Sequence, residues 1–420
     1  MAIQRPRGVN DILPPVTNKW RAVEALFHQM CAEYGFNEMR TPLFEDTDLF
    51  KRGVGENTDI VQKEMYTFTD QGGRSLTLRP EFTAALCRAY VENKMHGLPQ
   101  PQKFYCLGPL FRYERPQAGR FRQFHQFDIE VIGTISPLAD AECIVFAWDF
   151  YSRLNIKGLM ARLNSVGCPA CRSVYRAALQ EHLRPGLAEL CPSCQGRFER
   201  APMRILDCKS EICRGVAAHA PAITDYLCEE CADHFTTVKD ILAACGIPYS
   251  VDSSLVRGLD YYTKTVFEIC SKDIGSQSAV CGGGRYDGLV EIIGGASTPA
   301  IGVALGIERV FAALKAQNED VELEEVIDAF VATDFDVAPA MKAAFALASS
   351  LRQSGVSTAM DYEGKSLKAQ LKTANRLQAA YAVIVGAQEV SSGKAQVKNM
   401  ESGEQIEMDI GQVRRYLLEC

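Results

Sequence analysis

The stretch Phe111–Ile132, FRYERPQAGRFRQFHQFDIEVI, decides the fold of this chain. We interpret it as a hairpin of two strands joined by a loop that contains Pro116 and Gly119. Side chains of a strand alternate between its two faces, so residues two positions apart lie on the same side. One face of the second strand is therefore expected to be apolar. The residues of this face are Phe127, Ile129 and Val131.

The opposite face of the second strand is polar apart from one aromatic side chain. Its residues are Arg120, Arg122, Phe124, Gln126, Asp128 and Glu130. On the first strand, Arg112 and Glu114 are expected to share this face. A solvated side of an antiparallel sheet would explain the charges. Phe124 among them favours a platform on which a flat ligand stacks, and the residues alone leave both interpretations open.

The composition is that of a globular protein with room for two or three domains. The chain has 420 residues, of which 47% are hydrophobic and 23% charged. No apolar run approaches the length of a membrane span, and no signal-peptide pattern follows Arg5 and Arg7. We therefore expect a cytoplasmic protein without membrane contact. A net charge of -7 argues against nucleic-acid binding by the whole surface, although a local basic patch could bind RNA.

Hydrophobic periodicity predicts further elements on both sides of the hairpin. Helices are expected over residues 20–34, 84–95, 140–154 and 307–315, and strands over 65–68, 75–78, 255–269 and 300–306. Glu81 and Thr83 precede a helix, where they either cap it or hold a substrate ammonium. Residues 281–287 contain three consecutive glycines and are predicted to form a turn, with ligand approach as the alternative.

A charged linker over residues 318–325 precedes a segment of different character. Its predicted strands are 329–332, 357–362 and 382–385, and its predicted helices are 338–354 and 366–378. This alternation is typical of an α/β domain with a largely parallel sheet. One face of the second helix carries Lys365, Lys368, Lys372 and Arg376, and the other Leu367, Leu371 and Leu377. The basic face is either simply solvated or in contact with phosphates.

Several of these segments resemble motifs of the class II aminoacyl-tRNA synthetases. Residues 35–42 resemble motif 1, residues 111–126 motif 2 and residues 302–309 motif 3. More specific are TDIVQKEMYTF at 58–68, LRPEFTA at 78–84 and LVRGLDYYT at 255–263. These three are similar to signatures of the histidyl-tRNA synthetase family.

The resemblance implies a domain plan and an activity. The plan is an α+β catalytic domain on an antiparallel sheet at 1–167 and 246–324, a helical insertion at 168–245, and a C-terminal α/β anticodon-binding domain at 325–420. The implied activity is that of a histidine–tRNA ligase, in which L-histidine and ATP form histidyl-adenylate and the histidyl group moves to the 3' end of tRNA(His). Mg²⁺ is expected with ATP, although no motif fixes its ligands. Motif 1 implies a homodimer.

The resemblance also implies roles for individual residues. For ATP these are Arg112, Glu114, Phe124 and Arg309, and for histidine Glu81, Thr83, Gln126, Glu130, Arg257, Tyr261 and Tyr262. The implied catalytic residues are Arg257, Arg112 and Arg309. Fixed cations suit this reaction because negative charge accumulates on the phosphoryl oxygens. For tRNA the candidates are Arg115, Gln117, Arg120, Lys368 and Lys372.

The insertion departs from typical members of the family by its cysteines. Cys168/Cys171, Cys191/Cys194 and Cys228/Cys231 are C-x2-C pairs, and Cys208/Cys213 is a looser fourth. Such pairs present two thiolates to one tetrahedral Zn²⁺, and disulfides are rare in the cytoplasm. A structural zinc is therefore expected. The pairing among the four pairs stays open, because a helix predicted over residues 172–183 separates the first two.

Two other functions compete with the ligase. One is a non-catalytic, histidine-sensing regulatory subunit of ATP phosphoribosyltransferase, which generally lacks the anticodon-binding domain and tends to lose motif residues. Residues 257–262 and the tail from residue 325 argue against it. The other is a zinc-dependent RNA-binding adaptor without catalysis. It would explain the cysteines and the basic helix but not the polar platform of the hairpin.

Overall fold

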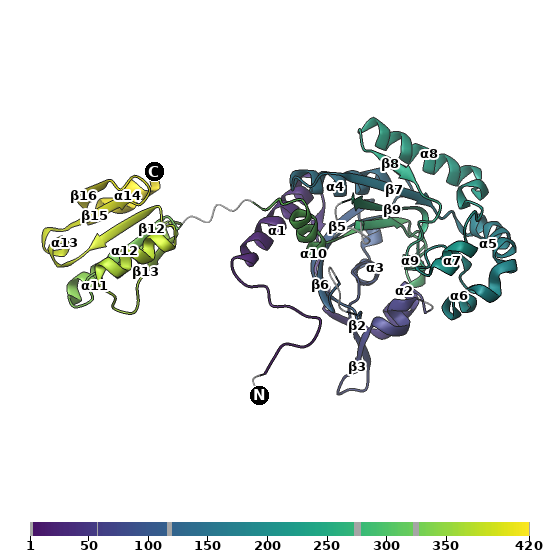
Figure 1. Cartoon of the computed structure of the whole chain (residues 1–420), viewed down its shortest axis with the longest axis horizontal. Helices are drawn as coiled ribbons and strands as arrows, with labels where there is room; N and C mark the ends of the chain where they lie inside the picture. Colours follow the sequence, from purple (N-terminus) through teal and green to yellow (C-terminus); the bar gives the residue numbers. More distant parts are fainter. Residues whose placement is uncertain (1–2, 57, 116–119, 273–278, 322–326, 420) are drawn as a thin grey trace. The chain divides into compact units, whose positions relative to one another are not determined.

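The computed structural model describes residues 3–56, 58–115, 120–272, 279–321 and 327–419. The chain divides into two compact units, residues 1–322 and residues 323–420. Among the described residues, no helix combines the length and the apolar character that crossing a membrane would require. Figure 1 shows both units, with labels on most of their helices and strands.

The first unit is built on a sheet of eight strands. In spatial order these are β1 (Asn37–Glu38), β5 (Gln102–Phe111), β6 (Gln123–Ile132), β11 (Ala300–Gly306), β10 (Ala279–Arg285), β9 (Thr263–Ser271), β7 (Leu159–Ser165) and β8 (Tyr249–Val251). Neighbours from β5 to β7 pair antiparallel, whereas the two edge strands pair in parallel. The predicted α+β fold on an antiparallel sheet is therefore confirmed.

The hairpin from which the prediction started is the β5–β6 pair. Phe127, Ile129 and Val131 are buried in the main hydrophobic core, as the strand parity predicted. Helices on this side of the sheet are α1 (Val16–Glu33), α4 (Pro137–Arg153), α8 (Glu229–Ala244) and α10 (Ile307–Ala316), and each contributes to that core. Phe27 of α1 stacks on Phe127, with ring centroids 4.2 Å apart. Since one face of β6 is used for packing, the other is left for the site.

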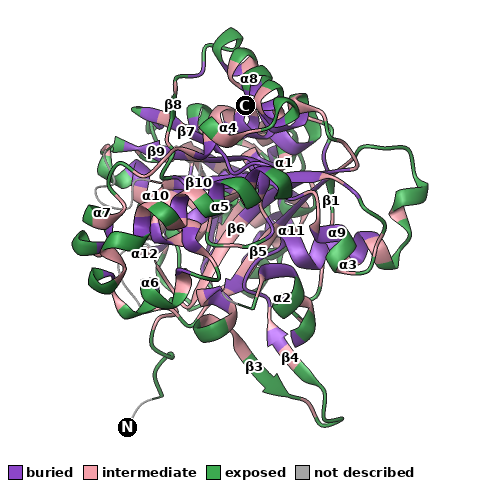
Figure 2. Ribbon diagram, turned by 90° about the vertical axis from the view of Figure 1, so that its right-hand side faces the viewer, coloured by how far each residue is buried: buried purple, intermediate pink, exposed green. Residues whose placement is uncertain are grey.

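A smaller three-stranded sheet lies beside the large one. Its order is β2 (Phe44–Asp46), β4 (Ser75–Leu78) and β3 (Tyr66–Thr69), all antiparallel. The hairpin of β3 and β4 extends from the body as a largely exposed ribbon (Figure 2). Short helices nearby are α2 (Thr47–Val54), α3 (Thr83–Glu92) and α9 (Leu289–Ile292), and a π-helical turn spans Ile60–Glu64.

The insertion is helical, as expected. It contains α5 (Pro169–Leu183), α6 (Pro192–Arg197), α7 (Glu211–Val216) and α8, joined by 3-10 turns at Arg184–Glu189, Pro202–Ile205 and Ile223–Tyr226. A further 3-10 turn at Met95–Gly97 lies outside the insertion. The insertion has a small core of its own around Tyr175, Leu179 and Leu183. In Figure 1, α5, α6 and α7 gather at one end of the unit, while α8 runs beside α4.

The second unit has five strands in the order β13 (Thr358–Met360), β12 (Ala329–Thr333), β14 (Tyr381–Val385), β15 (Lys394–Asn399) and β16 (Gln405–Asp409). Its helices are α11 (Ala338–Gln353), α12 (Leu367–Arg376), α13 (Ala387–Ser392) and α14 (Ile410–Glu419). The three predicted strands pair in parallel, and the final two, which the sequence patterns did not predict, add an antiparallel edge. Leu377, expected on the apolar face of α12, is exposed, whereas Gln370 and Ala374 are buried instead.

Two strand assignments near the site are wrong. Residues 255–262 form a loop, and β9 begins only at Thr263. Their apolar pattern comes from tertiary packing, because Leu255 packs into the core of the insertion and Tyr261 packs near α3 and α9. Arg112 and Glu114 follow the end of β5 and belong to the loop of the hairpin. Arg112 still pairs with the second half of the hairpin, since its backbone N–H donates to the Arg122 carbonyl at 2.9 Å. Arg122 and Arg120 were also predicted on the second strand, but both precede β6.

The glycine-rich segment is not a turn. Gly282, Gly283 and Gly284 lie inside β10, between β9 and β11. A Cβ on Gly283 would lie 2.2 Å from the carbonyl oxygen of Gly302 on β11. The missing side chains therefore make room for neighbouring groups of the protein itself, which neither the predicted turn nor the alternative of ligand approach anticipated.

Candidate functional site

A cavity of about 330 Å³ lies over the polar face of the large sheet. Residues of β6, β9, β10 and β11 line it, together with the loop at 257–262. The predicted site residues that line it are Glu81, Arg112, Glu114, Arg120, Phe124, Gln126, Arg257, Tyr261, Tyr262 and Arg309. Thr83 and Glu130 are not part of its lining, and both are buried.

The strand parity of β6 places its polar residues in this cavity. Phe124, Gln126 and Asp128 line it, whereas Phe127, Ile129 and Val131 point into the core. Glu130 continues the same face and pairs in register with Gly302 of β11. A Cβ on Gly302 would lie 1.7 Å from Glu130 Oε2. Only glycine at this position leaves room for the carboxylate, so β11 and β6 shape this part of the site together.

The Glu130 carboxylate is 2% exposed and held by two hydroxyl groups. Thr83 Oγ1 donates to Glu130 Oε1 at 2.7 Å, and the Tyr286 hydroxyl donates to Glu130 Oε2. Burial raises the pKa of Glu130 to about 8, although the hydrogen bonds from Thr83 and Tyr286 act to lower this pKa. A positive charge brought near Glu130 would favour its ionised form.

Two more buried carboxylates lie near Glu130. Glu81 accepts a hydrogen bond from the Ala84 backbone N–H at 3.0 Å, so it caps α3 as the sequence suggested. Burial raises the pKa of Glu81. Burial also raises the pKa of Asp128 well above its usual range, and Glu130 and Glu81 add to this effect. Asp128 Oδ1 has no hydrogen-bond partner among the described residues. One part of the cavity is thus suited to a cation or to N–H donors.

Arginines form the remaining polar wall. Arg112 Nε donates to the Pro80 carbonyl at 2.9 Å, which anchors the side chain after the end of β5. Its guanidinium carbon lies 5.2 Å from the ring centroid of Phe124. The ring and the guanidinium plane together offer a surface on which a flat, electron-rich group can stack.

Arg120 and Arg309 complete this wall. Arg120 Nη1 lies 3.1 Å from Glu114 Oε2, an ion pair within the hairpin loop. Arg309, in the first turn of α10, donates from Nη1 to the Ala279 carbonyl at 2.9 Å. Such fixed guanidinium groups are suited to hold phosphate oxygens through parallel hydrogen bonds.

Arg257 reaches the cavity from the loop and lies across β10. Its guanidinium forms an ion pair with Glu268 of β9. A Cβ on Gly282 would lie 2.5 Å from Arg257 Nη1, so the glycine leaves the space that this side chain occupies. Arg257 Nε is buried and has no hydrogen-bond partner within the described parts of the chain. Its guanidinium carbon lies 6.0 Å from the ring centroid of Tyr262.

Several residues of the site were not predicted to belong to it. Asp128 was correctly placed on the polar face of β6, but no role was predicted for it. Glu268 and Tyr286 have no local signal, because their contacts with Arg257 and Glu130 arise only from tertiary structure. Glu308 lies inside the motif 3 segment and accepts hydrogen bonds from the His125 backbone N–H and, depending on the tautomer, from its ring. This contact ties α10 to β6.

Of the residues expected to contact tRNA, only Arg120 lines the cavity within the described parts of the chain. Gln117 falls outside the described residues, and Arg115 is exposed in the hairpin loop away from the cavity lining. On α12 of the second unit, Lys368 and Lys372 are exposed. No carboxylate of the described chain lies within ion-pair distance of these two lysines, whereas Lys365 pairs with Glu363 at 2.6 Å.

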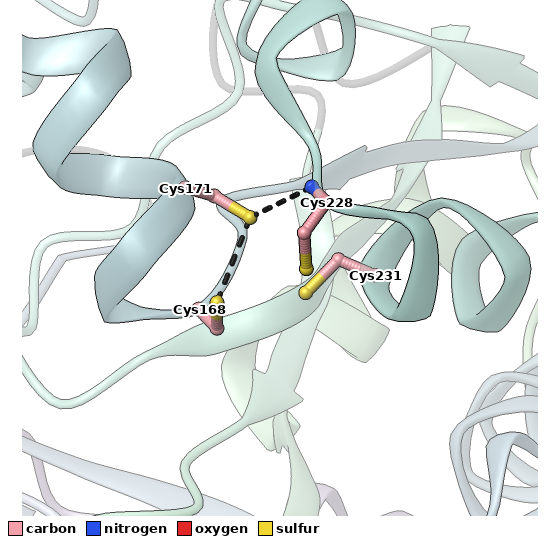
Figure 3. Close-up of side chains that lie close together, drawn as sticks. All are labelled: Cys168, Cys171, Cys228 and Cys231. Atoms are coloured by element: carbon pink, nitrogen blue, oxygen red, sulfur yellow. Dashed lines mark hydrogen bonds between the residues drawn. The ribbon is translucent and has the colours of Figure 1, made fainter.

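Eight of the nine cysteines of the insertion gather in two groups of four. One group is Cys168, Cys171, Cys228 and Cys231, and the other is Cys191, Cys194, Cys208 and Cys213. Within each group all sulfur atoms lie within 4.8 Å of one another. The pair Cys168/Cys171 is therefore grouped with Cys228/Cys231, and not with Cys191/Cys194, the next pair in the sequence. Figure 3 shows the first group, with the sulfurs of Cys168, Cys171, Cys228 and Cys231 turned toward a common centre.

Comparison with known proteins accounts for the whole chain. A family model described as histidyl-tRNA synthetase matches residues 8–310, and a model for an anticodon-binding domain matches residues 329–419. A histidine–tRNA ligase of Desulfitobacterium hafniense (strain DSM 10664 / DCB-2) is 54% identical over 412 residues, 98% of this chain and 96% of that protein.

Solved structures agree with this assignment. The crystal structure of apo histidyl-tRNA synthetase from S. aureus matches with a TM-score of 0.85 and 41% identity, covering 99% of this chain and 100% of that chain. A Bacillus halodurans ATP phosphoribosyltransferase regulatory subunit/histidyl-tRNA synthetase is only 18% identical, with a TM-score of 0.65 over 92% of this chain and 99% of that chain, and shares the fold alone. The regulatory-subunit alternative is therefore not favoured. The chain belongs to the histidyl-tRNA synthetase family and is an aminoacyl-tRNA ligase.

Proposed function

We propose that the cavity over β6 is the place where this histidine–tRNA ligase activates its amino acid. A carboxylate oxygen of histidine attacks the α-phosphorus of ATP, and pyrophosphate leaves with the electron pair of the broken P–O bond. A hydroxyl of the tRNA 3'-terminal ribose then attacks the carbonyl carbon of the adenylate, and AMP leaves. The observation that carries the proposal is that buried carboxylates and fixed arginines line one cavity.

The carboxylates would bind the amino acid. Glu81, Gln126 and the buried Thr83 would hold the α-ammonium group, and the unpaired oxygen of Asp128 supports adding this residue to the set. Glu130 would accept a hydrogen bond from an imidazole N–H. A site built to pair a polar ring rejects analogues that lack its N–H groups, because the buried carboxylate would then stay unpaired. Tyr262 would also contact the ring, and Tyr261 would form the pocket wall.

The arginines would bind ATP and the reacting groups. Arg112 would hold the α-phosphate with Glu114 near the adenine, Phe124 would stack on the base, and Arg309 would meet the γ-phosphate. Arg257 would lie beside the reacting carboxylate and the α-phosphate, where negative charge accumulates. Mg²⁺ would accompany ATP, with phosphate oxygens as ligands. The carboxylates of the cavity that contact its arginines are Glu114, which pairs with Arg120, and Glu268, which pairs with Arg257.

The remaining parts of the proposal concern tRNA and assembly. The hairpin loop with Arg115 and Arg120 would approach the acceptor end, and Lys368 and Lys372 would contact phosphates of the anticodon stem. The exposure of both lysines, with no described carboxylate beside them, supports this role. A homodimer in the cytoplasm is part of the same proposal and rests on the family assignment.

Histidine-dependent exchange of labelled pyrophosphate into ATP tests the proposal. The ligase must show exchange that depends on histidine and does not require tRNA. Normal binding of histidine without any exchange would indicate a histidine sensor and contradict the proposal. Binding of RNA without histidine binding or exchange would indicate an adaptor.

A further inference from the structure

We propose that the insertion holds two structural zinc ions, one bound by Cys168, Cys171, Cys228 and Cys231 and the other by Cys191, Cys194, Cys208 and Cys213. The proposal is independent of the role assigned to the catalytic cavity. Under this proposal Cys168/Cys171 shares an ion with Cys228/Cys231, and Cys191/Cys194 with Cys208/Cys213, a pairing that the sequence left open. The second ion would lie beside the loop that carries Arg257.

The sulfur positions fit one tetrahedral ion in each group. Four thiolates at the usual Zn–S distance are about 3.8 Å from each other. The sulfurs of Cys168 and Cys171 are 3.6 Å apart, and those of Cys191 and Cys208 are 4.0 Å apart. A disulfide would bring a pair to about 2.0 Å. In an iron–sulfur cluster the four thiolates are divided among two or four iron atoms, so all four do not lie as close together as around one ion.

Local structure explains why the C-x2-C spacing places two sulfurs together. Cys168, Cys191 and Cys228 are the N-cap residues of α5, α6 and α8. Their partners lie three residues later, in the first turn of the same helix, where a side chain turns back toward the N-cap.

Backbone N–H groups donate hydrogen bonds to one sulfur in each group. The Cys228 N–H donates to Cys171 Sγ at 3.1 Å, and the Cys191 N–H donates to Cys213 Sγ at 3.2 Å. The first bond links the pair Cys228/Cys231 to the pair Cys168/Cys171, as Figure 3 shows. The second bond links Cys191/Cys194 to Cys208/Cys213. Hydrogen bonds to the ligands are the usual outer layer of a metal site.

The first site joins the beginning of the insertion to its end. Next to it, the Lys264 N–H donates to the Gly167 carbonyl at 3.0 Å, and the Val166 N–H donates to the Lys264 carbonyl at 2.7 Å. Arg172 donates to the Tyr262 carbonyl at 3.1 Å. An ion here would hold α5 and α8 against the start of β9. With four protein ligands and no open position, the site is structural and not catalytic.

The second site supports the segment that faces the catalytic loop. Arg204 donates to the Gly258 carbonyl and to Asp260 Oδ1, both at 2.8 Å. Asp207 and Cys208 line a neighbouring pocket together with Arg257. Two of the ligands, Cys194 and Cys213, are fully buried in the core of the insertion. The second ion would therefore fix the position of residues 204–209 beside Arg257.

The zinc content of the full-length protein, purified without added metal, is the primary test. We expect about two zinc ions per chain and no iron, with tetrathiolate charge-transfer bands after replacement by Co²⁺. A zinc content of about one ion per chain or less would overturn the proposal of two sites.

Paired cysteine variants test the pairing. C168S/C228S changes one group only, and we expect it to lose about one ion. C168S/C191S changes both groups and should lose both ions. The opposite pattern, with C168S/C191S keeping one ion and C168S/C228S none, would show that neighbouring pairs in the sequence share an ion. C245S, which changes an exposed cysteine outside both groups, is the matched control and should keep both ions.

Alkylation of the wild-type protein during stepwise removal of zinc answers the same question without variants that risk unfolding. Cysteines of one site must become reactive together as its ion leaves. We expect Cys168 and Cys171 to react with Cys228 and Cys231. Joint reaction of Cys168 and Cys171 with Cys191 and Cys194 would contradict the assignment.

Discussion

Gly282 of β10 leaves the space in which the guanidinium of Arg257 lies, because a Cβ on Gly282 would come within 2.5 Å of Arg257 Nη1. Arg257 lies in a loop and Gly282 in a central strand. The sequence around either residue gives no indication that the two are in contact. Since Arg257 is proposed to meet the reacting carboxylate and α-phosphate, the strand controls the position of a catalytic group.

Gly282→Ala is expected to displace Arg257 and to slow adenylate formation by about 100-fold, the usual effect of losing one fixed donor to developing charge. Single-turnover formation of histidyl-adenylate measures this rate. Gly288→Ala is the matched control, since a Cβ there meets no atom within 4 Å, and should leave the rate unchanged. Equal rates for wild type and G282A would show that Arg257 does not need this position.

Arg257→Ala should depress adenylate formation far more than histidine binding. The loss is expected to be about 100-fold or more in the rate, because the charge on the phosphoryl oxygens develops fully only in the transition state. Calorimetric titration with histidine and single-turnover kinetics separate the two effects. Arg257→Lys keeps the charge and should recover part of the rate. Equal losses in binding and rate would mean that Arg257 is only a substrate clamp.

Glu130→Gln should change how stability depends on pH. The pKa of Glu130 is raised to about 8 by burial, so the folded protein binds a proton that the unfolded chain releases above its ordinary pKa near 4.5. This contribution to stability is complete below pH 4.5 and is lost as the pH rises to about 8. Without the titrating group, the variant should lose less stability between pH 5.5 and pH 8, by on the order of 1–3 kcal/mol.

Urea unfolding of the histidine-free protein at both pH values measures this difference. We expect the variant to keep its tertiary structure, because the amide oxygen of its side chain can still accept the hydrogen bond from Thr83. An identical pH dependence in wild type and variant would show that Glu130 is ionised throughout, as it would be beside a permanent cation.

Asp128→Asn tests the residue that sequence reasoning left without a role. Its unpaired carboxylate oxygen is proposed to hold the α-ammonium, so removing the charge should raise the KM for histidine by about 10-fold or more, the loss of a charged hydrogen bond. The KM for ATP should change little. Asp240→Asn removes an exposed carboxylate of α8 and should have no effect. A normal KM for histidine in D128N would exclude Asp128 from the substrate site.

Removal of two charges from α12 should weaken tRNA charging and spare pyrophosphate exchange. For Lys368→Gln with Lys372→Gln we expect a several-fold higher KM for tRNA and a weaker dependence on salt, because phosphate contacts release counterions. Lys342→Gln with Arg414→Gln removes two exposed charges elsewhere in the same unit and is the matched control. Loss of exchange as well would indicate a folding defect.

Periodic segments of the fold were predictable from the sequence. β4 (Ser75–Leu78) and β11 (Ala300–Gly306) have the predicted bounds, and the parity of β6 correctly divided its residues between core and cavity. These elements bury one face each, so local pattern and tertiary environment agree. The same parity could have assigned Asp128, whose side chain shares the polar face with Gln126.

Segments shaped by tertiary contacts were not predictable. Position 282 of β10 is occupied by glycine because the guanidinium of Arg257, from another segment of the chain, lies where a Cβ would be. The loop at 255–262 is apolar because it packs against the insertion and α3, not because it pairs in a sheet. The grouping of Cys168 with Cys228 depends on how four short helices pack, which no spacing rule encodes.

A crystal structure of the protein with a non-hydrolysable analogue of histidyl-adenylate would show directly how the cavity binds its substrate. We expect the α-ammonium within hydrogen-bond distance of Glu81, Gln126 or Asp128, the imidazole against Glu130, and the phosphate between Arg112 and Arg257. An analogue bound in the reverse direction, with its phosphate beside the buried carboxylates, or bound outside this cavity, would contradict this expectation.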